Sequence, residues 1–379
     1  MDSHDLAIVG GGPVGLFLGL AAARRGCSVV VLESRKGAEG LDDRRAIALP
    51  WGSVLKLARV GIDLRDAPEA TPIRTIHVSR TGQPGRTVLS AEEASVPALG
   101  VVVRYGDLLH RLDALARARI DMRHGTNVES AETHDGRARI RTSQGEFDAR
   151  VGVVADGGGT LLESAGFRVT VQDYGVHAVV ARVRCDRSSD VIAYERFSGP
   201  GPIALLPAAG EYALIWTLPP ERAAELHRCN PDAFLRSLQS AFGWRAGRFV
   251  GVDERGTYPL RSRRTEPVVQ DRIVAVGNAA QSLHPVAGQG LNLGVRDAWF
   301  LADRLADADT GAAAPLAQYA NARRGDRAFT MGFTDILARS FSPDVPGLSL
   351  VRGAALEFLD LVPVARRVFA RTLSVATIH

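Results

Sequence analysis

The first 33 residues combine features that dictate how this end of the chain folds. Leu6–Val9 is a short apolar run typical of a buried strand, and Gly10–Gly15 follows it with glycines spaced as G-x-G-x-x-G. Leu16–Arg25 then has the pattern of a helix, and a second apolar run, Ser28–Leu32, ends at Glu33. Strand, glycine-rich turn, helix, strand and acid in this order predict a dinucleotide-binding βαβ unit in an open, mostly parallel sheet.

Each residue type in such a unit has a defined task. The glycines make the tight turn and let the backbone reach a pyrophosphate, while the helix N-terminus stabilises its charge. The acid binds ribose hydroxyls, and an acid rather than an arginine argues against a 2′-phosphate. FAD and NAD both fit these requirements. The predicted contacts are Gly10, Gly12, Pro13, Val14, Gly15 and Glu33.

A second glycine-rich crossover lies late in the chain, at residues 272–298. Ile273–Val276 is short enough for a buried strand, and the apolar spacing becomes helical from Leu291. A strand, a loop and a helix start direct several backbone N–H groups at one place, which suits an electron-rich heterocycle that gains negative charge when reduced. The candidate contacts of this segment are Gly277, Asn278, Gly288, Gly290, Leu291 and Asn292.

Three charged residues lie where predicted strands end. Arg45 follows the first βαβ unit, and Arg104 separates a strand from the helix Tyr105–Ala116. Asp156 closes the strand that begins at Val151. Ligands of open α/β sheets bind outside the carboxyl ends of the strands. We therefore expect Arg45 and Arg104 to reach the nucleotide phosphates, and Asp156 to border the same ligand.

Composition limits the remaining classes. A chain of 379 residues with 46% hydrophobic and 23% charged residues is globular and long enough for two domains. Three cysteines without a C-x-x-C pair indicate a reducing compartment, and no basic leader or apolar run of about 20 residues is present. Scattered arginines and a net charge of +4 argue against nucleic acid as a partner. We expect a cytoplasmic protein without a metal site.

From Val169 the pattern changes to alternating strands without intervening helices, which predicts an antiparallel sheet in a second domain. The expected nucleotide-binding domain comprises residues 1–70, 98–170 and 265–335, the substrate domain 71–97 and 171–264, and a C-terminal helical segment 336–379. Apolar candidates for the substrate surface are Tyr194, Phe197, Ile203, Leu205, Pro207 and Trp216, and the alternative for each is burial against helices in the core of this domain. Ile203, Leu205 and Pro207 share one strand face, which we expect to meet the cofactor.

These motifs carry a family resemblance. Gly10–Gly15 and Gly277–Asp297, with Asp156-Gly157 between them, resemble the flavin-dependent aromatic hydroxylases of the p-hydroxybenzoate hydroxylase fold. Asp43–Leu49 and Gly201–Pro207 are similar to the ubiquinone-biosynthesis (UbiH/VisC-type) polyprenyl-phenol hydroxylases, and the resemblance extends over essentially the whole chain.

The resemblance implies an α/β fold with a Rossmann-like FAD-binding (GR2-type) domain and an antiparallel substrate domain. It implies FAD as cofactor, NAD(P)H and O2 as co-substrates, and hydroxylation of an aromatic ring through a C4a-hydroperoxyflavin. The loop Pro285–Asn292 then faces the isoalloxazine, with the N–H groups of Leu291 and Asn292 near its pyrimidine edge. The catalytic candidates are His284, Pro285 and Gly288, with a packed loop histidine as the alternative for His284.

Two departures and two alternatives accompany this interpretation. Asn278 stands where the superfamily usually has Asp, and Gly158–Glu163 lacks the basic residue that usually follows Asp-Gly and docks the nicotinamide. The alternatives are a flavin monooxygenase of another aromatic or secondary metabolite, and a non-catalytic flavin-binding accessory protein of a biosynthetic complex. Leu361–Leu373 has amphipathic helical spacing with arginines close by, which suits peripheral contact with the inner membrane or packing on its own domain.

Overall fold

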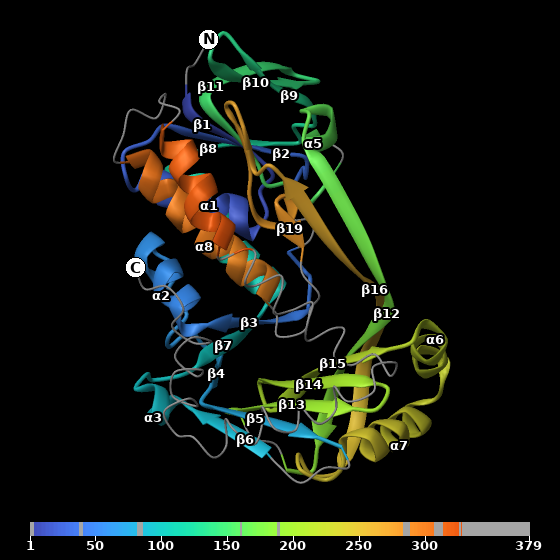
Figure 1. Ribbon diagram of the computed structural model, residues 1–379. Helices are drawn as coiled ribbons and strands as arrows, with labels where there is room; N and C mark the ends of the chain where they lie inside the picture. Colours follow the sequence, from blue (N-terminus) through green and yellow to red (C-terminus); the bar gives the residue numbers. More distant parts are fainter. Residues whose placement is uncertain are drawn as a thin grey trace.

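The computed structural model describes residues 4–37, 41–81, 86–159, 161–187, 190–282, 289–306, 314–325 and 327. The described chain forms two eight-stranded sheets and one three-stranded sheet. Figure 1 shows the first eight-stranded sheet at the top and the second at the bottom, joined by the long strands β12 and β16. The fold is therefore mixed α/β, as the sequence predicts.

The first sheet is built around the N-terminal strand β1 (His4–Val9), which pairs in parallel with β2 (Val29–Glu33) and β11 (Gly145–Val154). Every residue of β2 and the last four of β1 and β11 are buried, as expected of parallel strands covered on both faces. The other strands are β8 (Asp121–His124), β9 (Val128–His134), β10 (Arg137–Thr142), β17 (Val269–Gln270) and β18 (Ile273–Ala275).

Helices from both ends of the chain pack on this sheet. α1 (Pro13–Ala23) is apolar on nearly all sides, because it packs against α8 (Gln289–Ala306) and α4 (Tyr105–Arg119) as well as the sheet. α2 (Trp51–Val60) also contacts α8 and ends at Gly61, whose φ of 103° favours glycine. The short helices are α3 (Ala91–Ala94), α5 (Leu161–Ser164) and the 3-10 turn Gly277–Ala279.

The second sheet has the strand order β19-β16-β12-β15-β14-β13-β5-β6. Its strands are β5 (Thr75–Arg80), β6 (Arg86–Ser90), β12 (Arg168–Cys185), β13 (Ile192–Ser198), β14 (Gly201–Ala208), β15 (Glu211–Leu218), β16 (Phe249–Glu266) and β19 (Gln281–Ser282). The predicted antiparallel sheet differs in one pairing, because β13 runs parallel to β5. That pairing joins segments more than 100 residues apart, which no local pattern encodes.

The two faces of the second sheet have different cover. α6 (Pro220–Arg228) and α7 (Pro231–Phe242) close one face over a separate apolar core (Figure 1). On the other side, β14 contacts the three-stranded sheet of β3 (Ala46–Pro50), β7 (Gly100–Arg104) and β4 (Thr71–Ile73). No helix among the described residues is long and apolar enough to cross a membrane.

Candidate active site

The N-terminal glycines shape a cradle at the carboxyl end of β1. Gly10 has a φ of 107°, and a Cβ atom there would lie 2.5 Å from the carbonyl oxygen of Ala155. A Cβ on Gly15 would lie 2.1 Å from the carbonyl oxygen of Gly10. At Gly12, by contrast, no described atom lies within 4 Å of the Cβ position. The turn therefore needs two glycines for its own packing and leaves space at the third, where the motif places a pyrophosphate.

The start of α1 is suited to an anion. Gly12 is the N-cap and offers no side-chain acceptor to the first turn, and Pro13 occupies the first helical position. The first turn carries no acidic residue. Its backbone N–H groups and the positive end of the helix dipole are thus available to a phosphate group.

Glu33 lies at the end of β2, directly beside this turn. Its buried carboxylate accepts hydrogen bonds from the N–H of Gly11 and from Arg35, whose guanidinium also reaches the carbonyl of Gly11. Burial raises the pKa of Glu33, but the hydrogen bonds from Arg35 and Gly11 outweigh it and hold the pKa below its ordinary value. Glu33 is thus an ionised acceptor next to the turn. Sequence reasoning missed Arg35, since nothing in its spacing marks it.

The two glycine-rich motifs, separated by more than 260 residues, meet at Val14. A Cβ on Gly277 would lie 3.2 Å from Val14, and one on Gly294 would lie 2.7 Å from it. Asn278 is exposed, and its Oδ1 lies 3.9 Å from the Cβ position of Gly290. The late crossover therefore packs directly on the first turn of α1, as expected if both motifs contact one ligand.

The first turn of α8 is also tied to β3. Asn292 is 2% exposed, and its Nδ2 donates a hydrogen bond of 2.9 Å to the carbonyl of Ala48. Leu291 beside it is partly buried. This bond fixes the first turn of α8 against β3, so the predicted contacts Leu291 and Asn292 lie at a rigid junction.

Arg45 and Arg104 lie side by side at the edge of the three-stranded sheet. Arg104 is the register partner of Ala46, and the N–H of Tyr105 donates to the carbonyl of Arg45 at 2.8 Å. The guanidinium carbon of Arg45 lies 5.5 Å from the centre of the Tyr105 ring. Burial raises the pKa of Tyr105, while the positive charge of Arg45 opposes that rise. Both arginines are exposed, but the guanidinium of Arg45 is paired with the carboxylate of Asp43 at 2.5 Å, so a phosphate group would share Arg45 with Asp43.

A basic side chain from β16 contacts the loop after Asp156, which has no basic residue of its own. The Asp156 carboxylate accepts hydrogen bonds from the N–H groups of Gly158 (2.9 Å) and Gly159 (3.2 Å). Arg263 of β16 donates to the carbonyls of Gly158 and Gly159 from the other side. Only the register of β16 against β12 brings Arg263 to this loop, which is why sequence spacing did not identify it.

Most of the predicted substrate residues face the wrong side of the second sheet. Trp216 packs edge-on against Phe234 of α7 at 6.5 Å between ring centres. Tyr194, Ile203, Leu205 and Trp216 are at most 8% exposed in the core under α6 and α7. Side chains this buried do not line a substrate surface. Alternation along β14 puts Pro207 on the same face, whereas Phe197 on β13 points to the opposite one.

The error has a simple cause. An alternating strand marks one buried face, but a covering helix and a bound ligand produce the same alternation. α6 was not expected from the sequence, and it closes this face together with α7. The predicted catalytic residues His284, Pro285 and Gly288 lie outside the described residues.

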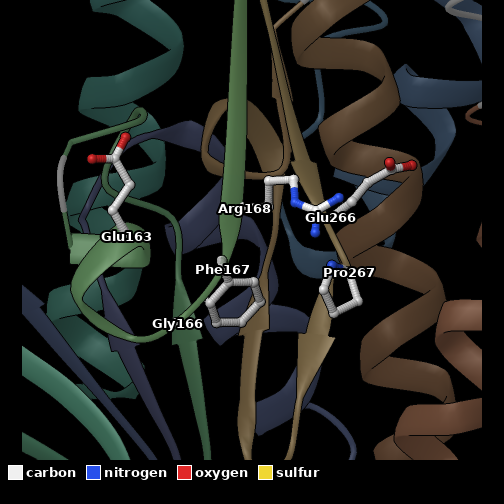
Figure 2. A pocket seen from close by; sticks show the side chains of 6 residues that line it. All are labelled: Glu163, Gly166, Phe167, Arg168, Glu266 and Pro267. Atoms are coloured by element: carbon white, nitrogen blue, oxygen red, sulfur yellow. The ribbon is translucent and has the colours of Figure 1, made fainter.

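A surface hollow of about 460 Å³ lies where β12 begins and β16 ends. Figure 2 shows its lining side chains, which include Glu163, Phe167, Arg168 and Glu266. None of the predicted contact residues lines it, and it is formed by the start of one strand and the end of its neighbour. We assign it no role.

Comparison with known proteins agrees with this geometry. A family model described as "FAD binding domain" matches residues 3–330. The chain belongs to this FAD-binding family. FAD is therefore its cofactor, and the cradle at Gly12 together with the ionised Glu33 fits that group. NAD(P)H is the co-substrate typical of the family.

Full-length relatives carry related names. The chain is 35% identical over 390 residues to a protein named ubiquinone hydroxylase UbiL from Rhodospirillum rubrum, covering 97% of this chain and 88% of that protein. It is 29% identical over 378 residues to the 3-demethoxyubiquinol 3-hydroxylase of Escherichia coli, with 96% of each chain covered. These matches confirm the resemblance on which the interpretation as a flavin-dependent aromatic hydroxylase was based.

Solved structures confirm the fold. p-Nitrophenol 4-monooxygenase PnpA from Pseudomonas putida superposes with a TM-score of 0.77 at 20% identity, covering 98% of this chain and 97% of that one. PqsL from Pseudomonas aeruginosa, titled a probable FAD-dependent monooxygenase, superposes with a TM-score of 0.75 at 21% identity, covering 94% of this chain and 100% of that one.

Proposed function

We propose that this protein is an FAD-dependent monooxygenase that hydroxylates the aromatic ring of a polyprenyl phenol in ubiquinone biosynthesis. The contact of the two glycine-rich motifs at Val14 carries the flavin part of the proposal, because it joins the cradle at Gly12 to the first turn of α8. The full-length match to proteins named as ubiquinone and demethoxyubiquinol hydroxylases supports the substrate class.

The chemistry of the cofactor determines which tasks are left to the protein. Bound FAD would supply the activation of O2, from which the transferred oxygen atom comes. The protein itself has to bind and orient the substrate and exclude water. We assign the pyrophosphate to the turn at Gly12 and the start of α1, and the ribose to Glu33. The remaining predicted flavin contacts are Arg45, Arg104, Asp156, Gly277, Asn278, Gly288, Gly290, Leu291 and Asn292, and His284, Pro285 and Gly288 remain the proposed residues beside the ring.

We also propose the domain division predicted from the sequence. Its FAD-binding segments 1–70, 98–170 and 265–335 contain all strands of the first sheet. Its substrate segments 71–97 and 171–264 contain most of the second. The boundaries at 170/171 and 264/265 fall inside β12 and β16, so limited proteolysis should leave the two units joined at these positions, and cleavage there would contradict the paired strands.

Electrons are proposed to come from NAD(P)H docked near the Asp156 loop. Arg263 supports this, since it places a guanidinium over Gly158 and Gly159, where the loop sequence has no cation. Replacing Arg263 with Gln should raise the KM for the reduced nicotinamide and leave the KM for the phenol unchanged. An unchanged nicotinamide KM would remove Arg263 from this role.

Peripheral membrane contact is proposed for the C-terminal segment, because a polyprenyl substrate dissolves in lipid. The arginines Arg366, Arg367 and Arg371 beside an amphipathic pattern support attraction to an anionic surface. Flotation with anionic liposomes should decrease when all three are replaced by Gln. Equal flotation of both forms would contradict the contact.

Stopped-flow reduction tests the central proposal. The purified protein should show a flavin absorbance spectrum, and NADH or NADPH should bleach it faster in the presence of a demethylated polyprenyl-phenol analogue. Acceleration by soluble phenols alone would favour the other-aromatic alternative. A bound flavin that neither nucleotide reduces, with any phenol, would favour a non-catalytic accessory protein.

A further inference from the structure

Glu195 places a carboxyl group in the middle of the second sheet. Its strand neighbours both point toward α7: Tyr194 packs on Phe242 with ring centres 5.7 Å apart, and Arg196 donates a hydrogen bond to the carbonyl of Ala241. Because strand side chains alternate, Glu195 points to the opposite face. Of the predicted substrate residues, Phe197 alone lies on this face.

That face is the side on which the proposed flavin site lies. Ala193, two residues before Glu195, shares its face and packs in a cluster with Val102 of β7. Ala48 of β3 lies against the same cluster, and its carbonyl accepts the hydrogen bond from Asn292 in the first turn of α8. Glu195 is thus on the sheet face turned toward β3 and the start of α8, where the ring of the flavin is proposed to bind.

The surroundings of Glu195 on the sheet are apolar. Its cross-strand row consists of Val78 on β5, Ala204 on β14, Ile215 on β15 and Val180 on β12. Within the described part of the chain, Glu195 has no hydrogen-bond or ion-pair partner. A part-buried carboxyl group in an apolar row is costly unless something else hydrogen-bonds to it. A ligand polar group on this face would supply that partner.

Burial alone raises the pKa of Glu195 to about 8. The other ionisable groups on this side, among the described residues, are Arg80 on β5, Arg182 and Arg184 on β12, Glu211 on β15, Asp253, Glu254 and Tyr258 on β16, and Arg44 and Arg45 before β3. Arg182 pairs with Glu211, Arg44 with Glu254, and Arg45 with Asp43. These three pairs hold their charges in contacts that do not include Glu195.

We propose that Glu195 is a catalytic residue that accepts the proton of the substrate's phenol. This rests on the proposed function. The phenolic O–H bond breaks, the proton forms an O–H bond with a Glu195 carboxylate oxygen, and the electron pair stays on the phenolate oxygen. No electron is exchanged with the protein. The phenolate ring is richer in electrons at the carbon that receives the oxygen atom, and the proton returns to the product.

The proton affinities of the two groups are close enough for this transfer. A phenol has an ordinary pKa of about 10 and a solvated glutamate one of about 4.5, so the two differ by more than five orders of magnitude in proton affinity. With Glu195 near 8 the difference falls to about two orders. A carboxylate in this part-buried, apolar position is therefore a better base for a phenol than an exposed one.

Glu195→Gln tests the proposal, because it keeps the shape of the side chain and removes the base. The variant should bind FAD normally, and its kcat/KM for the phenol should fall about 10²- to 10⁴-fold. The rise in wild-type rate with pH around 8 should disappear. Glu195→Asp should keep that pH step at a reduced rate. Tyr194→Phe, on the other face of the same strand, should keep both rate and pH profile.

A binding measurement separates proton transfer from turnover. A chromophoric phenol whose absorbance changes on ionisation should bind to the FAD-loaded wild type partly as phenolate, and to Glu195→Gln as the neutral phenol. Equal spectra, or an unchanged pH profile and rate in Glu195→Gln, would overturn the role of Glu195. If the wild type hydroxylates no phenol at all, the proposed function fails and this proposal fails with it.

Discussion

The three glycines of the turn after β1, Gly10, Gly12 and Gly15, differ in the reason why glycine is needed at each position. Gly10 and Gly15 have backbone atoms within 2.5 Å of their Cβ positions, whereas Gly12 has an extended backbone (φ −73°, ψ 174°) and open space before it. Spacing alone predicted that all three belong to one motif, but it could not separate packing from ligand contact. That distinction depends on which backbone atoms face each glycine in the folded chain.

Gly12→Ala should therefore weaken FAD binding without weakening the fold. A methyl group would occupy the space assigned to the pyrophosphate, and we expect the Kd for FAD to rise at least about tenfold, or ~1.4 kcal/mol. The urea midpoint of the apoprotein should stay the same or rise slightly, since the backbone of Gly12 is allowed for alanine. Gly15→Ala is the contrasting variant and should lose stability in the apoprotein. Loss of apoprotein stability in Gly12→Ala would contradict this assignment.

The raised pKa of Glu195 also has a consequence for stability. The folded protein favours the protonated carboxyl, so its stability should fall as the pH rises from about 4.5, the ordinary value, to about 8. The largest loss of unfolding free energy is about 1.4 kcal/mol for each unit by which folding raises the pKa of Glu195. Glu195→Gln should match the wild type near pH 4 and exceed its unfolding free energy at pH 8.5. Urea titrations at both pH values check this, and a constant difference would contradict it.

Individual elements show where the sequence was informative. The bounds of α7, Pro231–Phe242, follow from local signals in the sequence, because Asn230 caps the helix and apolar residues recur at helical spacing. β16 was not predicted, because its 18 residues are mostly polar and its pairing partner β12 lies some 80 residues away. Strands defined by a distant partner leave little local signal, and this is also why Arg263 was missed.

The two faces of β14 give a paired prediction. Leu205→Ala leaves a cavity under α6 and α7, so we expect a loss of about 2–5 kcal/mol in unfolding free energy and an unchanged KM for the phenol. Ala204→Val, next to it on the face of Glu195, should instead raise the KM with a smaller loss of stability. Chemical denaturation and steady-state kinetics distinguish the two. The reverse pattern would mean that the substrate binds on the helix-covered face.

α8 is anchored by a buried ion pair. Asp297 is fully buried and accepts hydrogen bonds from Arg323 (2.6 Å) and Gln281 (2.7 Å). Asp297→Asn leaves the Arg323 charge without its counter-ion, and should cost about 3–5 kcal/mol. Asp303 lies on the same helix and forms a more exposed ion pair with Arg25, which follows α1. Asp303→Asn breaks this pair and should cost at most about 1 kcal/mol. Equal losses by urea denaturation would contradict the distinction.

At the scale of the whole molecule, the proposed site lies between two sheets that the chain visits alternately. The long strands β12 and β16 of the second sheet extend to the first sheet. β3 lies between the two sheets (Figure 1). The class of fold and the flavin motifs could be predicted, because each motif is continuous in sequence. The proposed substrate face could not, because it is assembled from β5, β13, β14 and β15 and its cover is decided by tertiary packing.

Isotope labelling during turnover tests the hydroxylase account most directly. The FAD-loaded protein would be supplied with reduced nicotinamide, a demethylated polyprenyl phenol and ¹⁸O2, and the product analysed by mass spectrometry. The account predicts a product that carries one added oxygen atom derived from ¹⁸O2. Nicotinamide consumption that yields only hydrogen peroxide, with no labelled product from any phenol, would contradict it.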